Sequence, residues 1–317
     1  MYSHASDWNP ATICPPSEVI EPCSCYRFCQ ECYSNIQCKN IYDLEIMSRV
    51  LDESSDYQYV GFSLKQSSLM YLPEPLFDAK QLRYLAIKES TLRSLFDAKP
   101  NVAPQITYMI LDKVRLLGGI QWDLLSGFTN LKRLILFHTR VTKIGESFVE
   151  YAPKSLEEVK INNCSTARIH DEGFASLPNL LEVYVMSGRI KELKRSMFPK
   201  PSKLKSFNFS WNRLSSLPLD IFSEMPDLMY VYLGGNDLKE MPGTIFAPVF
   251  PKLLVFHFDG NPLKCRCNIS WITGTGKHLE PRNFLGACHE PKNLQGRHIR
   301  DLVAEDFFHC FLFSCFH

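Results

Sequence analysis

Apolar residues recur along most of this chain in blocks that repeat every 23 to 25 residues. Within a block they occupy the first position and offsets 3, 5, 10 and 13, so a short alternating stretch is followed by wider spacing. The blocks begin at residues 59, 82, 106, 131, 156, 180, 204, 228 and 253. A repeat of this kind cannot bury its apolar face alone and must stack on its neighbours. The pattern therefore predicts a solenoid rather than a globule.

The clearest blocks fit the leucine-rich pattern L-x-x-L-x-L-x-x-N-x-L. Two matching copies begin at Leu204 and Leu228, and a later phenylalanine, Phe222 or Phe246, completes each one. The alternating part of a block predicts a short strand, and the strands of stacked blocks should form one parallel sheet. We expect an α/β repeat solenoid, a right-handed leucine-rich repeat horseshoe with a parallel concave sheet. It should have eight full units and a ninth that leads into a C-terminal cap.

Offset 8 distinguishes the two halves of the chain. It is asparagine in the last three blocks (Asn212, Asn236 and Asn261) but serine, valine, threonine, cysteine or glycine earlier. An asparagine amide can bond the backbone groups that a tight, buried turn would otherwise leave unpaired. Valine cannot do so, and we therefore expect looser geometry around Val114 and residues 117–119.

Charge and hydropathy exclude several classes of partner. The chain has 35 basic and 34 acidic residues, a net charge of +1, which favours neither nucleic acid nor an anionic membrane. No apolar run in the sequence reaches the roughly 18 residues that a membrane helix needs. The apolar stretch from Phe307 to Phe316 is best explained as closing the end of the solenoid, with a peripheral anchor as the alternative. We expect no membrane association, no nucleic acid and no small-molecule cofactor.

The twelve cysteines indicate an oxidising compartment, because eleven of them lie near the two ends of the chain. Terminal repeats need caps, and caps of this size hold too little core to fold without disulfides. We therefore expect an extracellular, secreted glycoprotein. Residues 1–13 lack the basic start and apolar run of a signal peptide. We expect a missing leader exon; a cytosolic repeat protein with metal-binding ends is the alternative.

These patterns divide the chain into four predicted segments. They are a disordered segment at 1–13, an N-terminal cysteine-rich cap at 14–58, about eight repeats at 59–260, and a C-terminal cysteine-rich cap at 261–317. Inside the first cap, apolar residues at helical spacing predict a short amphipathic helix before the first repeat: Ile41, Leu44, Met47 and Leu51.

Four cysteines of the C-terminal cap have a distinctive spacing: Cys265, Cys267, Cys288 and Cys310. Spacing alone leaves three possible connectivities. A zinc site that includes His289 or His309 would need a compact tetrahedral set of ligands. The loops of 20 and 21 residues between single thiols favour disulfides instead.

The N-terminal cap holds six cysteines: Cys14, Cys23, Cys25, Cys29, Cys32 and Cys38. The inner C-x-x-C pair can be a redox centre or half of a zinc site, but no β-α-β pattern follows it. A local disulfide, or pairing across the cap, is therefore expected. Cys164 stands at offset 8 of its repeat, which predicts a reduced structural thiol. Cys315 is either a thiol or a link between two chains.

From residue 14 to residue 310 the chain resembles secreted extracellular leucine-rich repeat proteins with cysteine-rich flanking domains at both ends. The four C-terminal cysteines and Trp271 between them carry the resemblance at that end. It implies first-to-third and second-to-fourth pairing, Cys265 with Cys288 and Cys267 with Cys310.

The opening of the chain is similar to a narrower arthropod group, the non-catalytic subunit of oplophorus-luciferin 2-monooxygenase and its relatives. The similarity rests on the Cys-Pro at residues 14–15 and the Pro-Cys-Ser-Cys at residues 22–25. It implies a partner-binding or stabilising role and transfers no catalytic residue.

A partner-binding surface is predicted where strand residues that flank the core positions line the concave face. On three consecutive repeats they form an aromatic cluster: Tyr184, Met186, Trp211, Tyr230 and Tyr232. Basic residues lie on the adjacent two repeats: Lys132, Arg133 and Lys160. Exposed aromatics with arginine are typical anchors of protein interfaces, so we expect a protein partner on the concave face. The alternative is an ordinary amphipathic face.

Three N-x-S sequons predict glycosylation if the chain is secreted: Asn163, Asn208 and Asn268. Asn208 falls between Tyr184 and Tyr232 on the predicted binding face. A glycan at Asn208 and a central aromatic interface therefore exclude each other.

The sequence predicts no catalytic, cofactor-binding or metal site. His138 and His257 fall on the predicted strand face with Asp112 and Asp259 nearby, but no G-x-S-x-G elbow, phosphate loop or H-E-x-x-H motif accompanies them. We expect a non-catalytic extracellular protein-binding scaffold, an accessory or stabilising subunit of a secreted complex. The alternatives are an ectodomain-like adhesion or receptor module and, from another class, a secreted enzyme.

Overall fold

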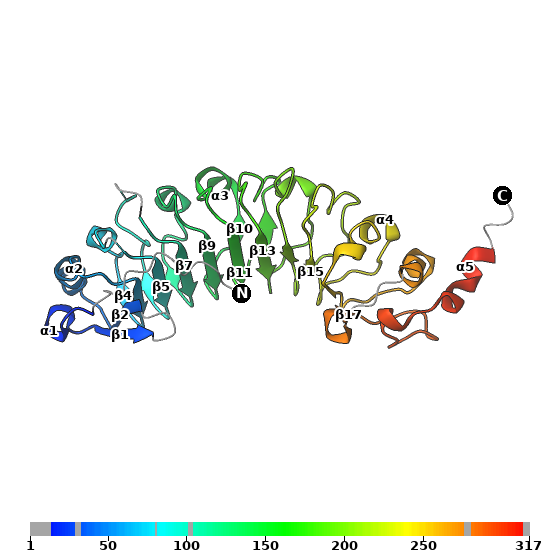
Figure 1. Ribbon diagram of the computed structural model, residues 1–317, viewed down its shortest axis with the longest axis horizontal. Helices are drawn as coiled ribbons and strands as arrows, with labels where there is room; N and C mark the ends of the chain where they lie inside the picture. The colour runs from blue at the N-terminus through cyan, green and yellow to red at the C-terminus, as the bar shows by residue number, and fades with distance from the viewer. Residues whose placement is uncertain (1–13, 29–32, 80, 101–103, 276–279, 313–317) are drawn as a thin grey trace. The chain divides into compact units, whose positions relative to one another are not determined.

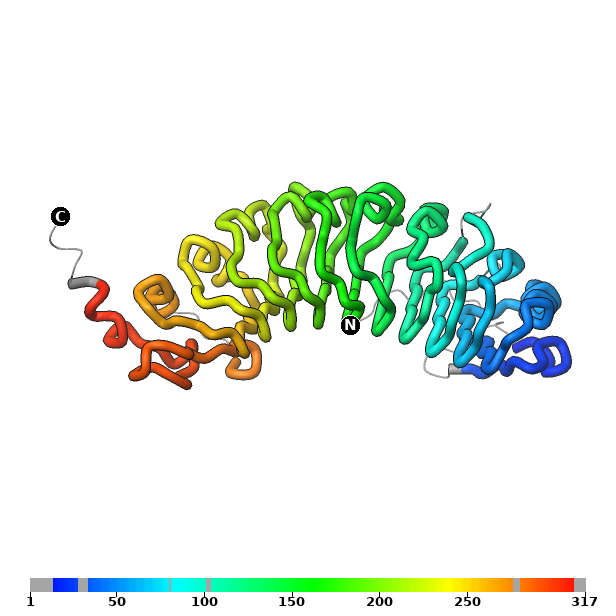
Figure 2. Tube along the Cα trace, turned by 180° about the vertical axis from the view of Figure 1, so that it is seen from behind, coloured from blue at the N-terminus to red at the C-terminus, as the bar shows by residue number. Residues whose placement is uncertain are grey.

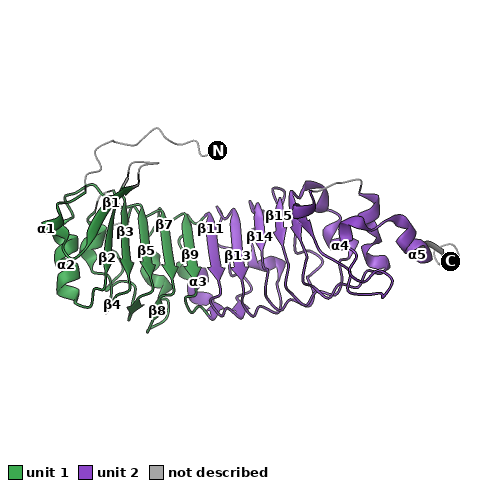
Figure 3. Cartoon of the chain, turned by 90° about the horizontal axis from the view of Figure 1, so that it is seen from below, with its two compact units in different colours: residues 1–141, 150–156 green, residues 142–149, 157–317 purple. Residues whose placement is uncertain are grey.

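The structure, a computed structural model, describes residues 14–28, 33–79, 81–100, 104–275 and 280–312. Residues 1–13, which the sequence predicts to be disordered, lie outside these ranges. The chain divides into two compact units, residues 1–141 with 150–156 and residues 142–149 with 157–317 (Figure 3). Each unit is a stack of repeats with its own row of strands.

The first unit is built on a row of strands that lie side by side (Figure 1). The row comprises β1 (Ser24–Phe28), β2 (Tyr33–Lys39), β3 (Gly61–Lys65), β5 (Tyr84–Lys88), β7 (Tyr108–Asp112) and β9 (Arg133–Phe137). β1 is antiparallel to β2, and each later pair in this row is parallel. Each of the strands β3, β5 and β7 is followed in sequence by a shorter strand, and these shorter strands pair in parallel as a second row: β4 (Ser68–Leu69), β6 (Thr91–Leu92) and β8 (Arg115–Leu116). The helical elements are α1 (Ser17–Ile20), α2 (Leu44–Glu53) and the 3₁₀ helices η1 (Glu74–Phe77) and η2 (Trp122–Leu125).

The second unit has the same plan, and its successive turns are visible in the tube of Figure 2. Its main strands pair in parallel: β11 (Glu158–Asn162), β13 (Glu182–Met186), β14 (Ser206–Asn208), β15 (Tyr230–Tyr232), β16 (Val255–His257) and β17 (Phe284–Leu285). β10 (Lys143–Ile144) pairs with β12 (Arg168–Ile169). The α-helices that follow β10 are α3 (Glu146–Tyr151), α4 (Gly243–Phe246) and α5 (Phe308–Leu312). The 3₁₀ helices are η3 (Arg195–Met197), η4 (Phe250–Lys252), η5 (Cys267–Gly274), η6 (Pro281–Asn283), η7 (Ile299–Asp301) and η8 (Ala304–Phe307).

The repeat register predicted from the sequence is confirmed, because every block from residue 59 onward places a main strand within offsets 2 to 6. Offsets 3 and 5 point into the core, as Val183 and Val185 of β13 do with 0% exposure each. Phenylalanines from the opposite side of each turn meet them there. Phe222 and Phe246 are buried with ring centroids 6.0 Å apart, so they complete their repeats as the pattern indicated.

The asparagines at offset 8 join consecutive turns of the second unit. Asn236 Oδ1 accepts a hydrogen bond from the Leu214 amide of the preceding turn at 3.0 Å, and its Nδ2 donates to the carbonyls of Phe209 and Leu233 at 3.0 and 2.9 Å. Asn212 and Asn261 make equivalent bonds. The three amides therefore form a continuous ladder through a buried turn.

The expectation of looser geometry around Val114 is wrong. Val114 is 3% exposed, and its amide donates to Thr139 Oγ1 of the following turn at 3.2 Å. Beyond it, β8 pairs in register with β6, and the Leu117 and Gly118 amides donate to carbonyls of the preceding turn at 2.9 and 3.0 Å. Backbone pairing thus fixes this segment where the side chain of Val114 cannot.

Disulfides close both caps. At the C-terminal end Cys265 pairs with Cys288 and Cys267 with Cys310, the connectivity that the resemblance implies. Trp271 of the same cap donates from Nε1 to the Met241 carbonyl at 2.9 Å and so attaches the cap to the last repeats.

At the N-terminal end Cys14 pairs with Cys25 and Cys23 with Cys38. The inner pair, Cys29 and Cys32, and the predicted thiol of Cys315 lie outside the described residues. The predicted amphipathic helix is α2, which begins after the N-cap Asp43 and buries Met47 and Leu51.

Cys164 should behave as a buried thiol, because it is 1% exposed and its Sγ lies 3.2 Å from the Asn162 carbonyl oxygen. We expect alkylation of the native, non-reduced protein to leave it unlabelled. The same reagent in denaturant should add one label at Cys164, while the cysteines of the four disulfides react only after reduction. Peptide mass spectrometry checks both results. A label on Cys265 or Cys267 before reduction would contradict the disulfide assignment.

Candidate protein-binding surface

The aromatic residues predicted to bind a partner lie in register on the exposed face of the sheet in the second unit. Tyr184 of β13 faces Asn208 of β14, which faces Tyr232 of β15. His257 of β16 continues this row, and its ring packs edge-on against Tyr232 with centroids 5.0 Å apart. Sequence reasoning left His257 out of the cluster, although its place at the same repeat offset was the signal that indicated it.

The middle of this row is recessed, because small polar side chains lie between the tyrosines. Ser206, Asn208 and Ser210 occupy the exposed face, yet they are only 3%, 7% and 8% exposed. Larger residues on the neighbouring strands cover them, as Tyr184 and Tyr232 do on either side of Asn208 in the sheet register. We call Tyr184, Trp211, Tyr230, Tyr232 and His257 the aromatic patch.

Trp211 is the most exposed member of the aromatic patch, at 61%. It follows β14 in a left-handed backbone conformation with φ 58°. Its ring lies against Gly235 of the next turn, where an added Cβ would stand 2.5 Å from the indole Cε3. Gly235 itself has φ 66°, a conformation that glycine adopts without strain. A glycine one repeat later therefore makes room for the exposed indole and holds it in place.

Tyr184 is held from two sides at the edge of the aromatic patch. Its hydroxyl donates to Glu182 Oε2 at 2.8 Å, and the Lys160 Nζ lies 4.4 Å from the centroid of its ring. Burial raises the pKa of the Tyr184 hydroxyl, and Glu182 raises it further while Ser206 opposes the shift. Lys160 also pairs with Glu158 at 2.6 Å. Tyr184 is thus a neutral, ordered ring at physiological pH.

The remaining predicted site residues fall into two groups. Met186 and Tyr230 are half-buried on the same face of the second unit. Lys132 and Arg133 are exposed, but they belong to the first unit, where the Arg133 guanidinium lies 5.3 Å from the centroid of Tyr108. The structure therefore brings the aromatic residues together with Lys160 and assigns the other two cations to a separate compact unit.

Comparison with known proteins agrees with the fold. A family model described as "Leucine rich repeat" matches residues 178–238, which include β13, β14 and β15. This chain has the leucine-rich repeat fold. A solved structure of a TLR13–ssRNA13 complex is similar to this chain with a TM-score of 0.60 at 21% identity, and the match covers 68% of this chain and 31% of that one. At that identity the likeness concerns the fold alone.

Two curated relatives differ in how much of this leucine-rich repeat protein they cover. Toll-like receptor 9 of Mus musculus is 24% identical over 188 residues, 57% of this chain but only 18% of the receptor. The oplophorus-luciferin 2-monooxygenase non-catalytic subunit of Oplophorus gracilirostris is 20% identical over 322 residues, 90% of this chain and 86% of that protein. These relatives support an extracellular protein-binding scaffold and are consistent with a protein that is not an enzyme.

The sequons of this leucine-rich repeat protein lie in different environments. Asn163 is exposed after β11, and Asn268 is half-buried in η5. Asn208 is 7% exposed, and its Oδ1 accepts a hydrogen bond from the Ser210 amide at 3.0 Å. A glycan attached to Asn208 would have to displace the tyrosines beside it.

Three of the histidines lie close to other polar or sulfur-containing groups. His138 Nδ1 lies 3.3 Å from Asp112 Oδ1 on the surface of the first unit, as their positions one repeat apart suggested. His257 Nε2 lies 3.1 Å from the Arg282 carbonyl oxygen. His309 lies close to the sulfurs of Cys267 and Cys310, but those sulfurs form a disulfide and cannot ligate a metal.

The helices in the described part of the chain are too short and too polar to cross a lipid bilayer.

Proposed function

We propose that this leucine-rich repeat protein is a non-catalytic extracellular scaffold that binds a protein partner through the aromatic patch. The observation that carries the proposal is the exposed Trp211, held over Gly235 and flanked by the ordered tyrosines of β13 and β15. Aromatic side chains fixed in place are typical of the residues that dominate protein interfaces, because they bury a large area with little loss of conformational freedom.

The proposal extends to an accessory or stabilising role in a secreted complex. Its support is the similarity to a non-catalytic subunit over most of both chains. The alternative of an ectodomain-like adhesion or receptor module is supported by the similarity to Toll-like receptor 9, of which this chain spans 18%. A secreted enzyme is the third possibility, from a different class.

Native purification distinguishes these roles. An accessory subunit should co-purify with one dominant soluble partner at fixed stoichiometry, whereas a receptor-type module should be recovered with membrane fractions. An enzyme should turn over substrate as an isolated chain.

The aromatic patch also predicts which of the sequons carry a glycan. We propose that Asn208 stays unmodified in the secreted protein, whereas the exposed Asn163 is the best acceptor. Glycopeptide mass spectrometry decides between them.

Replacing the anchors should weaken partner binding mainly through faster dissociation. We expect Trp211→Ala or Tyr232→Ala to cost about 2 kcal/mol or more of binding free energy, since truncation of a central aromatic anchor removes a buried contact. Surface plasmon resonance with the co-purified partner measures the rates. Lys160→Ala should instead lower the association rate at low salt.

Tyr42→Ala is the matched control, because this tyrosine is 69% exposed but lies in the first unit, outside the aromatic patch. The affinity of the Tyr42→Ala variant for the partner should equal that of the unmodified protein. If Tyr184, Trp211 and Tyr232 can all be replaced by alanine in a folded protein without loss of affinity, the partner binds elsewhere.

A further inference from the structure

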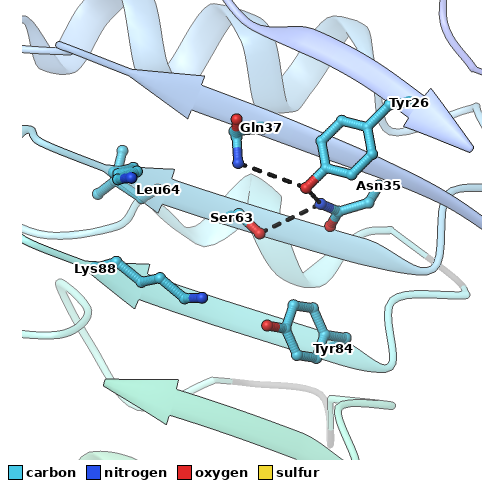
Figure 4. Close-up of a pocket in the computed structure, with 8 residues that line it drawn as sticks. Tyr26, Asn35, Gln37, Ser63, Leu64, Tyr84 and Lys88 are labelled. Atoms are coloured by element: carbon cyan, nitrogen blue, oxygen red, sulfur yellow. Dashed lines mark hydrogen bonds between the residues drawn. The ribbon is translucent and has the colours of Figure 1, made fainter. Parts of the chain in front are cut away.

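A polar recess opens on the sheet of the first unit, between the N-terminal hairpin and the first repeats (Figure 4). Its volume is about 210 Å³, and its walls come from β1, β2, β3 and β5. The space exists because β3 carries the small residues Gly61 and Ser63 at the register positions where β7 carries Tyr108 and Ile110.

The floor of the recess is a buried hydrogen-bonded cluster. Asn35, which is 2% exposed, donates from Nδ2 to Tyr26 Oη at 2.6 Å and to Ser63 Oγ at 3.3 Å. Gln37 Nε2 donates to the same tyrosine oxygen at 3.5 Å. The Asn35 Oδ1 lies over Gly61, where an added Cβ would stand 2.2 Å from it. Burying amides and hydroxyls is costly unless they are bonded, and in this floor Asn35 Oδ1 is buried without a hydrogen-bond partner among the described residues.

Two tyrosine rings flank the recess. Tyr26 comes from β1 and Tyr84 from β5, and Figure 4 shows them on opposite sides of Asn35 and Ser63. Tyr84 is supported from behind, because its ring packs edge-on against Tyr108 with centroids 5.4 Å apart. The recess therefore combines aromatic walls with a floor of amides and hydroxyls.

Lys65 and Lys88 line one end of the recess. Lys39, Lys65 and Lys88 stand in register on the neighbouring strands β2, β3 and β5, which lie about 4.8 Å apart in a sheet. Like charges directly opposite one another destabilise a sheet. Glu89, 3.8 Å from Lys65, and Asp112, in register with Lys88, offset only part of this charge. A bound anion would offset the remainder.

We propose that this recess binds one acidic sugar ring, a uronate or a sulfated hexose, within a longer saccharide. The volume is below the roughly 300–1,000 Å³ of pockets for drug-sized ligands, which suits a single ring. The tyrosines can stack on the C–H face of the sugar, the floor can bond its hydroxyls, and Lys65 and Lys88 can bond its anionic group. An acidic protein side chain would use the lysines but leave the polar floor and the aromatic walls without a match.

Calorimetric titration of the full chain tests the ligand class with a heparin octasaccharide, the same saccharide desulfated and N-acetylated, and, for each of them, a poly-glutamate peptide of matching charge. At least one saccharide should bind about tenfold or more tightly than poly-glutamate, with affinity that falls as salt rises. If the desulfated saccharide still binds, the anionic group that the lysines recognise is the carboxylate. If it no longer binds, that group is the sulfate. Equal affinity for poly-glutamate would overturn the proposal.

Variants separate the recess from a general basic surface. The double variant Lys65→Ala, Lys88→Ala should lower saccharide affinity about tenfold or more, while Lys99→Ala, an exposed lysine of the same unit, should leave it unchanged. Ser63→Leu fills the recess without changing any charge and should also lower the affinity about tenfold. Tyr84→Ala serves the same purpose if Ser63→Leu lowers the melting temperature. Unchanged affinity in a folded Tyr84→Ala protein would overturn the proposal whatever the aromatic patch of the second unit binds.

Discussion

Replacing Phe207 with alanine should lower the free energy of unfolding of the second unit by about 3–5 kcal/mol, because it leaves a large cavity in a packed interior. Phe207 is 0% exposed, and its ring centroid lies 5.3 Å from that of Phe198, 4.6 Å from that of Phe209 and 5.4 Å from that of Phe222. It therefore joins the strand and the opposite side of two consecutive turns. Urea unfolding followed by circular dichroism measures the change.

Leu219→Ala is the control for that experiment. Leu219 belongs to the same repeat but is 73% exposed, so its loss should change stability by no more than about 0.5 kcal/mol. A cost below about 1 kcal/mol for Phe207→Ala would mean that the phenylalanines are packed more loosely than their ring distances indicate.

The second large effect concerns the asparagine ladder. Asn236→Ala should cost about 1–3 kcal/mol, because it leaves the Leu214 amide buried without its partner. The Phe209 and Leu233 carbonyls lose one bond each but keep the amides of Asn212 and Asn261 as donors. Each unsatisfied group typically costs about 1–3 kcal/mol. Chemical denaturation of the variant gives the value.

Asn236→Ser should fall between the alanine variant and the unmodified protein. A hydroxyl can hold one amide of the neighbouring turn, as Ser90 Oγ holds the Ser67 amide at 3.1 Å. Asn293→Ala, at an exposed position, should leave stability nearly unchanged. Equal stability of the alanine and serine variants would contradict a hydrogen-bonding role for the ladder.

The sequence predicted the main strands and the core of the repeats in both units because the spacing of apolar residues determines them. Val183 and Val185 are recognisable as core residues from their alternation, and their burial follows. The asparagine ladder could be predicted equally well, because an asparagine at the same offset of successive turns can bond the backbone of a stacked turn. The error at Val114 arose because backbone pairing and Thr139, neither visible in the local pattern, compensate for the missing polar side chain.

The candidate sites were harder to predict from the sequence, because their geometry depends on neighbours one repeat away. Nothing local to Trp211 shows that Gly235 makes room for its indole, and nothing local to Asn208 shows that flanking residues bury it. The recess of the first unit depends on Tyr26, which the antiparallel hairpin of the cap brings opposite Asn35. The sequence pattern predicted a cysteine-rich cap in this segment but no strands.

The ladder also constrains how the second unit can change in evolution. Asn212, Asn236 and Asn261 each serve both their own turn and the one before, so any deletion must rejoin equivalent positions of two turns. Loss or duplication of a complete block satisfies this condition, whereas removal of a few strand residues would separate the asparagine amide of that turn from its acceptors. Variation in length should therefore occur in whole repeats, or in segments such as that around Leu219, which do not take part in the ladder.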